Sequence, residues 1–128
     1  MKNYQQLPAY LSGWDVAIMP FALNEATRFI SPTKTPEYLA GGKPVISTPI
    51  LDVVRHYSSV VSFITTSEEF IAVAENDIVQ DEKWLTQVDK ILSENSWDRT
   101  WNRMNEIIEK TLKYSANKVR TKNRDTYV

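Results

Sequence analysis

The sequence predicts an α/β protein with a short parallel sheet of about three strands and a helical C-terminal part. Three short apolar runs, each bounded by turn residues, alternate with segments of helical periodicity. Compact apolar runs of this kind are typical of strands buried in a parallel sheet. The 128 residues include four Trp, six Tyr and four Phe, which are enough large side chains to build the core of one domain.

The predicted strands are delimited by prolines and by neighbouring helices. The run DVAIMP ends in a proline, the run PVISTP has a proline at each end, and a third run, VVSFI, follows a short helix. We therefore expect strands at 15–20, 44–49 and 60–64. The segment 21–33 shows no clear period and is predicted to be a long loop, which in a compact domain is usually either functional or disordered.

Three short helices are expected among these strands. One to two turns are predicted over 5–12, and a short helix over 50–57. Another is predicted over 36–40, with Thr35 as its N-cap and Pro36 at the first helical position. Two glycines follow this helix and are expected to end it, because glycine accepts the positive φ that a helix end often needs.

The rest of the chain is predicted to be helical. Thr66 and Glu69 have capping-box spacing before one apolar stripe, and Trp84 begins another. Ser96 is expected to cap a long helix whose apolar stripe is predicted to be core: Trp97, Trp101, Met104, Ile108 and Leu112.

The composition excludes several classes of protein. No apolar stretch approaches the roughly 18 residues of a membrane span, and the first residues have no apolar signal core. The absence of Cys excludes disulfides and thiolate metal sites and favours a reducing, cytoplasmic location. A net charge of −1 makes no case for nucleic acid as a partner.

The charges are unevenly distributed along the chain. Segment 68–109 holds eleven acidic and four basic residues, whereas 110–124 holds six basic residues and no acidic one. A solvated C-terminal helix and tail would account for this, as would contact with an anionic surface such as the inner membrane face. A doubly wound domain normally opens on a strand, so the chain is expected to be the later part of a larger domain, with residues 1–113 as that part and 114–128 as a basic tail.

The segment 24–37 is the strongest candidate for a binding site. It follows the first strand, at the edge where open α/β sheets bind ligands, and it leads into a helix. Free N–H groups at that helix start, a lysine and several hydroxyls would together suit a phosphate. Lys34 would add a full charge, and Glu37 could accept hydrogen bonds from two sugar hydroxyls, which suggests a nucleotide. Equally, Glu37 could merely balance the helix dipole, and Lys34 could be a surface lysine.

Other polar residues also allow more than one interpretation. Arg28 is either solvated or a second contact to an anion, and Glu25 is more typical of a loop carboxylate than of a base. The one histidine, His56, lies near a helix end, where a structural role is expected. The sequence contains neither a set of residues with metal-ligand spacing nor a glycine-rich phosphate loop.

The block EYLAGGKPVIST at 37–48 resembles the donor-binding block of GT-B glycosyltransferases of the large family-4 type. The segments at 7–11 and 15–20 resemble the preceding helix and strand, and the long helix after Ser96 resembles the closing segment that packs back toward the N-terminal domain. The string from Pro20 to Glu37 looks like a bacterial envelope-polysaccharide subgroup, some members of which are fused to or annotated with UDP-galactopyranose mutase.

This resemblance implies a Rossmann-like C-terminal domain of three layers that binds a nucleotide sugar. The residue matching Glu37 would hold the ribose, and Lys34 would reach the diphosphate and act as a catalytic group. Glu25 is at best a shifted stand-in for the family's first glutamate, because Phe29 occupies that place. Further donor contacts are expected from nearby side chains and backbone: Thr27, Arg28, Ser31, Thr33 and Thr35.

The implied reaction is transfer of a hexosyl group from a nucleotide sugar, UDP-linked, to a growing surface glycan or lipid-linked acceptor. The family generally needs no metal or other cofactor. The acceptor would bind an N-terminal domain that this chain lacks, so the chain alone is expected not to turn over. Two alternatives are a subunit of a split enzyme and a non-catalytic interaction module. The first strand would lie at an apolar sheet edge, which predicts self-association there or an N-terminus that covers it.

Overall fold

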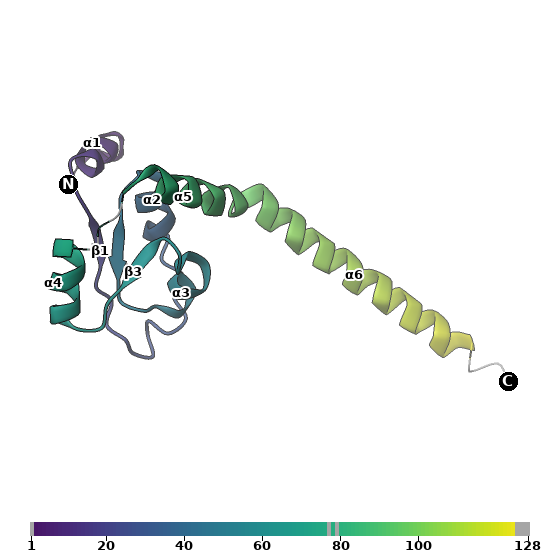
Figure 1. Cartoon of the computed structure of the whole chain (residues 1–128). Coiled ribbons are helices and arrows are strands. Elements are labelled where there is room, and N and C mark those ends of the chain that lie inside the picture. Colours follow the sequence, from purple (N-terminus) through teal and green to yellow (C-terminus); the bar gives the residue numbers. More distant parts are fainter. Residues whose placement is uncertain (1, 77, 79, 125–128) are drawn as a thin grey trace. The chain divides into compact units, whose positions relative to one another are not determined.

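The protein is mixed α/β, with three short strands and six α-helices among the described residues (Figure 1). The structure is a computed structural model that describes residues 2–76, 78 and 80–124, and the side chains of these except 76 and 116–124. In chain order the elements are η1 (Tyr4–Gln6), α1 (Leu7–Ser12), β1 (Ala17–Met19), α2 (Lys34–Ala40), β2 (Val45–Ser47), α3 (Leu51–Tyr57), β3 (Val61–Phe63), α4 (Ser67–Asn76), α5 (Glu82–Glu94) and α6 (Trp97–Arg124). The chain divides into two compact units, Met1–Ser93 and Glu94–Val128.

The three strands form one parallel sheet in the order β1-β2-β3. The predicted α/β class and the parallel sheet are therefore confirmed, and each strand is the central part of a predicted apolar run. In the register, Ile18 of β1 pairs with Ile46 of β2, which pairs with Ser62 of β3. Strand β1 lies at an edge, as expected, and Ile18 is half exposed there. Self-association through this edge stays a prediction.

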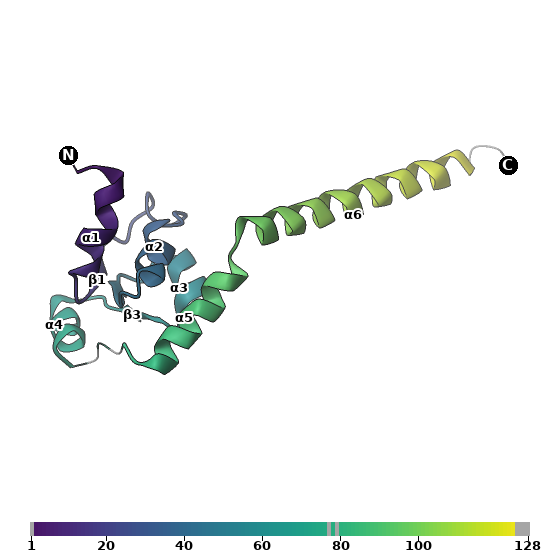
Figure 2. The ribbon, with the colours of Figure 1, turned by 90° about the horizontal axis from the view of Figure 1, so that it is seen from above.

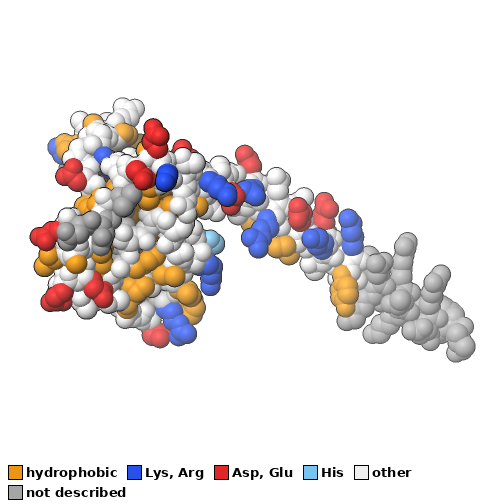
Figure 3. All heavy atoms as spheres, in the orientation of Figure 1, with side chains coloured by type: hydrophobic (Ala, Val, Ile, Leu, Met, Phe, Trp, Pro, Cys, Tyr) orange, Lys and Arg blue, Asp and Glu red, His pale blue; other side chains and the backbone are white. Residues whose placement is uncertain are grey.

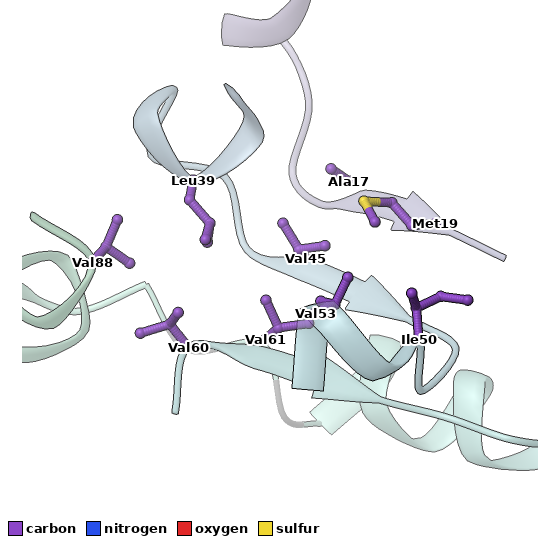
Figure 4. Close-up of a cluster of buried hydrophobic side chains, with 9 residues drawn as sticks. All are labelled: Ala17, Met19, Leu39, Val45, Ile50, Val53, Val60, Val61 and Val88. Carbon is purple, nitrogen blue, oxygen red and sulfur yellow. The ribbon is translucent and has the colours of Figure 1, made fainter. Parts of the chain in front are cut away.

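Alternation along the strands directs side chains to two faces of the sheet. One face carries Ala17, Met19 and Val45, which are buried against helices on that side (Figure 4). The other face carries Ile18 and Ile46, of which Ile46 is also buried. Figure 2 shows α2 and α3 on one side of the strands and α4 on the other. The central strand β2 is buried on both faces, which is why its sequence reads as an unbroken apolar run.

The core is a cluster of small and medium aliphatic side chains. Its fully buried members come from the sheet, from the helices α2, α3 and α5, and from the turns beside them: Ala17, Met19, Leu39, Val45, Ile50, Val53, Val60, Val61 and Val88 (Figure 4). Burying one such side chain stabilises the fold by about 1.5–3 kcal/mol. Helix α5 is tied to this core by Val88, and by the Trp84 indole N–H, which donates to Val60 O at 3.1 Å.

Helix α2 begins earlier than predicted. Its first residue is Lys34 and its N-cap is Thr33, so the predicted cap Thr35 and the predicted first residue Pro36 both lie within the first turn. The reason is that residues of the first turn have no N–H acceptor inside the helix, so proline is tolerated at any of these positions. The Thr35 side chain is fully buried, which is incompatible with an exposed cap and explains the shift.

The end of α2 agrees with the prediction. Gly41 is the C-cap, and Gly42 follows with φ at +68°, the left-handed region that glycine enters without steric cost. The Gly42 N–H donates to Leu39 O at 2.9 Å, and the Lys43 N–H donates to Tyr38 O at 3.0 Å. These bonds satisfy the last carbonyls of the helix and turn the chain directly into β2.

The predicted caps of α4 and α6 are confirmed. At α4 the Glu69 N–H donates to the Thr66 hydroxyl at 3.1 Å, and the Glu69 carboxylate accepts from the Thr66 N–H at 3.4 Å, which completes the capping box. At α6 the Arg99 N–H donates to the Ser96 hydroxyl at 3.2 Å. Two polar side chains therefore cap the start of α4, and one caps the start of α6.

The long stripe of α6 is the main departure from expectation. It was predicted to be core, but all five of its members are exposed: Trp97, Trp101, Met104, Ile108 and Leu112. The described part of the unit Glu94–Val128 forms one long helix, and a single helix has no second element on which to bury a stripe. The predicted boundary at 113/114 falls within α6, and 125–128 of the predicted tail lie outside the described residues. None of the helices in the described part of the chain is long and apolar enough to cross a membrane.

Candidate functional site

The carboxyl edge of the sheet brings the loop after β1 next to the segment after β2. The Thr48 N–H donates to Met19 O at 3.3 Å, and the Thr48 hydroxyl donates to Phe21 O at 2.8 Å. The Ser47 hydroxyl, which is buried, is 3.4 Å from Met19 O. Parallel neighbours end at the same edge, so these bonds fix the beginning of the long loop against the sheet.

The loop is further ordered by its own side chains. The Asn24 side-chain oxygen accepts from the N–H groups of Ala26 at 3.0 Å and of Thr27 at 3.2 Å. The Thr27 hydroxyl donates to Ala22 O and accepts from the Asn24 N–H at 3.1 Å. This hydroxyl, expected to contact a donor, is therefore already used to shape the loop.

An open hollow of about 560 Å³ lies between the loop and the start of α3. Three predicted site residues line it: Glu25, Thr27 and Arg28. Asn24 and the apolar residues Leu23, Pro49, Ile50 and Leu51 complete the lining. The hollow thus combines an apolar floor with polar groups at the edge where ligands bind open α/β sheets.

The two charged residues of the hollow lie close to each other. Arg28 Nη1 is 3.6 Å from Glu25 Oε1, and both side chains are largely exposed. The Arg28 guanidinium also lies 5.2 Å from the centre of the Phe29 ring. An exposed pair of this kind contributes little to stability, so both groups can exchange partners for a ligand at small cost.

Lys34 and Glu37 are brought together on one face of α2. Lys34 Nζ is 2.6 Å from Glu37 Oε2, with both side chains about half exposed. The hydrogen bond to Glu37 and then its charge raise the pKa of the Lys34 amine, which is therefore protonated at neutral pH. Neither side chain is among the residues that line the hollow. The two groups lie on the same face of α2, and each is the other's partner in this structure.

Thr35, which was expected to contact a donor, does not present its side chain at the surface. Its side chain is fully buried, and its hydroxyl is 3.5 Å from Met19 Sδ, so it faces the core instead of a ligand. The Thr35 N–H is 3.4 Å from Pro32 O, and Pro36 has no N–H. The start of α2 therefore offers fewer free donors than predicted, because the chain enters the helix through a turn that uses one of them. Ser31 and Thr33 are exposed.

Another group of charged and titratable residues lies on α3, where Asp52 is 3.6 Å from both Arg55 and His56. His56 Nε2 is 3.6 Å from Asp52 Oδ1 one turn earlier in α3, consistent with the structural role expected of it. Within the described residues, no group of three or more His, Asp or Glu side chains is placed to hold a metal ion.

The apolar floor of the hollow was missed by the sequence analysis. Pro49, Ile50 and Leu51 were read only as the end of a strand and the beginning of a helix. The available signal was topological: they follow β2, which neighbours β1, so they share an edge with the loop. Comparisons of the chain with protein-family models, with curated proteins and with solved structures found no match.

Proposed function

We propose that this chain is the nucleotide-sugar-binding part of a glycosyltransferase that acts in the synthesis of cell-surface polysaccharide and uses a UDP-linked donor. The proposal is carried by one observation, the placement of the Lys34 amine beside the Glu37 carboxylate on the first turn of α2. The resemblance of block 37–48, together with the string from Pro20 to Glu37, to family-4 glycosyltransferases implies a ribose contact for Glu37 and a diphosphate contact for Lys34.

The chemistry of the pair suits this role. A protonated lysine is a donor only, and an ionised glutamate is an acceptor only, so together they match a phosphate oxygen and a vicinal diol. On binding, Lys34 would exchange the carboxylate for the diphosphate, while Glu37 would accept from the ribose hydroxyls. The exchange is inexpensive, because an exposed pair contributes little net stability. During transfer the same lysine would stabilise the negative charge that grows on the departing diphosphate.

The hollow supports the proposal by supplying room for the sugar at the same sheet edge. A pyranose ring presents apolar C–H faces and hydroxyl groups, which match a floor of Pro49 and Ile50 and a rim of Asn24, Glu25 and Arg28. Turnover additionally needs an acceptor and a group that takes its proton, which the resemblance assigns to a separate domain. The proposal therefore concerns donor binding first.

Calorimetry with UDP and UMP tests the roles of the two residues separately. For the wild-type chain we expect binding in the millimolar range or tighter, with UDP bound more tightly than UMP. Lys34→Ala should weaken the binding of UDP by about tenfold or more, since a charge-assisted hydrogen bond is lost. The affinity for UDP should then be close to the affinity for UMP. Glu37→Gln should weaken the binding of UDP and of UMP by the same factor. It should also abolish any preference for UDP over its 2′-deoxy analogue.

Matched variants elsewhere control for net charge. Lys90→Ala on α5 and Glu75→Gln on α4 change the charge by the same amounts and should leave UDP binding unchanged. No binding of UDP to the wild-type chain would refute donor capture and leave the non-catalytic interaction module. Binding that survives both Lys34→Ala and Glu37→Gln would refute the assignment of the site.

A further inference from the structure

Helix α6 has a continuous apolar stripe that its own unit leaves exposed. The exposed fractions are 88% for Trp97 and 65% for Trp101 at the start of the helix, and 64% for Leu112 four turns later. Met104 and Ile108 complete the stripe at helical spacing. Ile107 widens it on one side.

The charged residues of α6 complement an anionic surface. Segment 97–124 contains eight basic and three acidic residues, and every charged residue from Lys110 to Arg124 is Lys or Arg. Helical spacing places Arg99, Arg103 and Lys110 away from the stripe. Figure 3 shows hydrophobic, basic and acidic side chains all exposed along α6. A helix with a Trp-containing apolar face, a basic polar face and low net hydrophobicity is typical of one that lies in the plane of a membrane surface.

The sequence of the stripe disfavours a second copy of α6 as the partner. A two-stranded coiled coil needs apolar residues at every 3.5 positions. Continued from Trp97, Trp101, Met104 and Ile108, this repeat reaches Thr111, Ser115, Lys118 and Lys122. A repeat that is polar at these four positions does not supply the apolar seam that two copies of α6 would need.

We propose that α6 binds the surface of an anionic lipid bilayer, with Trp97, Trp101 and Leu112 in the boundary between headgroups and acyl chains. The aromatic side chains suit this depth because an indole or phenol has an apolar body and a polar tip. Lys110 and Lys113 hold the helix at the surface by attraction to acidic headgroups. This inference does not depend on the proposed function and uses different residues.

Flotation of the full chain with vesicles tests the proposal. At low salt we expect binding to phosphatidylcholine vesicles containing about a third phosphatidylglycerol, with much weaker binding to pure phosphatidylcholine. Raising the salt should release the protein, because screening shortens the range of the attraction. Brominated phosphatidylcholine in the vesicles should quench tryptophan fluorescence, and Trp97→Gln/Trp101→Gln should abolish both the binding and the quenching.

Two double variants separate a specific surface from general charge. Lys110→Gln/Lys113→Gln should lower the partition coefficient by about 30-fold, since each lysine near an anionic surface contributes about fivefold. Lys83→Gln/Lys90→Gln on α5 removes the same charge and should have no comparable effect, and Asn102→Gln on the polar side of α6 should bind as the wild type does.

Three results would overturn the proposal. One is a wild-type chain that stays unbound with anionic vesicles at low salt. Another is an equal loss of vesicle binding in the two lysine double variants. That result would mean that the attraction depends on the total charge of the protein and not on the lysines of α6. The third is a dimer by light scattering that Trp97→Gln/Trp101→Gln dissociates, without vesicle binding, which would assign the stripe to a second copy.

Discussion

The two units of this chain use apolar side chains in opposite ways. In Met1–Ser93 the aliphatic residues converge from strands and helices, so Leu39 is 1% exposed. In Glu94–Val128 a single helix carries an equally apolar stripe, and Leu112 is 64% exposed. The first unit holds seven basic and eleven acidic residues, whereas the second holds eight basic and five acidic residues. An amphipathic pattern therefore identifies an apolar surface that needs to be covered, but it does not say what covers that surface.

The largest expected difference between the units lies in the cost of truncating a leucine. Leu39→Ala should lower the free energy of unfolding by about 2–5 kcal/mol, because it removes buried methyl groups and leaves a cavity. Leu112→Ala should change it by less than about 0.5 kcal/mol. Urea unfolding followed by circular dichroism measures both. A cost for Leu112→Ala close to that for Leu39→Ala would mean that α6 packs in a core, and the contrast between the units would disappear.

A smaller effect is expected from comparing two tryptophans. Trp84→Phe removes the indole N–H that donates to Val60 O at 3.1 Å and should cost about 1 kcal/mol of unfolding free energy. Trp97 is 88% exposed, so Trp97→Phe should be neutral in the same urea titration. If the two variants prove equally stable, the bond from α5 to the turn before β3 does not hold that helix in place.

The smallest expected effect is the pH dependence of stability that comes from the N-terminal caps of α4 and α6. Hydrogen bonds from the Thr65 N–H and hydroxyl lower the pKa of Glu69 from its ordinary value of 4.5. A lowered folded-state pKa stabilises the protein above the unfolded value, and this stability is lost as the pH falls through the lowered pKa. The stability advantage of the wild type over Glu69→Gln should therefore be constant at neutral pH and shrink below about 4.5.

The neutral cap of α6 is the matched comparison. Ser96 has no charge to titrate, so any advantage of the wild type over Ser96→Ala should be unchanged across the same pH range. Unfolding titrations at several pH values measure both differences. An advantage over Glu69→Gln that persists undiminished well below pH 4 would show that the carboxylate does not act as the cap of α4.

The sequence predicted the structure correctly where that structure depends on interactions among a few neighbouring residues. The capping box at Thr66 and Glu69, the serine cap of α6 and the glycine end of α2 were all predicted correctly, because each depends on hydrogen bonds within a few residues. The strands were found because their apolar runs match the two buried faces of a parallel sheet. The pairing of Lys34 with Glu37 likewise follows from a separation of three residues on a helix.

The failures arose where distant residues meet. Thr35 was assigned to a cap and to a ligand, yet its hydroxyl lies against Met19 Sδ, a contact that only the docking of α2 on β1 creates. The floor of the hollow is made by residues that follow β2, and no local pattern connects them with the loop after β1. Such contacts depend on strand order, which adjacent residues do not encode.

By itself, the sequence determined the α/β class, the positions of the strands, the ends of most helices and the amphipathic stripe of α6, since backbone geometry and capping act over a few residues. The tertiary structure decided which side chains are buried, which groups share the carboxyl edge and which apolar surface has no partner in its own unit. Burial is a collective outcome of packing, so a leucine of α2 and a leucine of α6, alike in local pattern, have opposite surroundings.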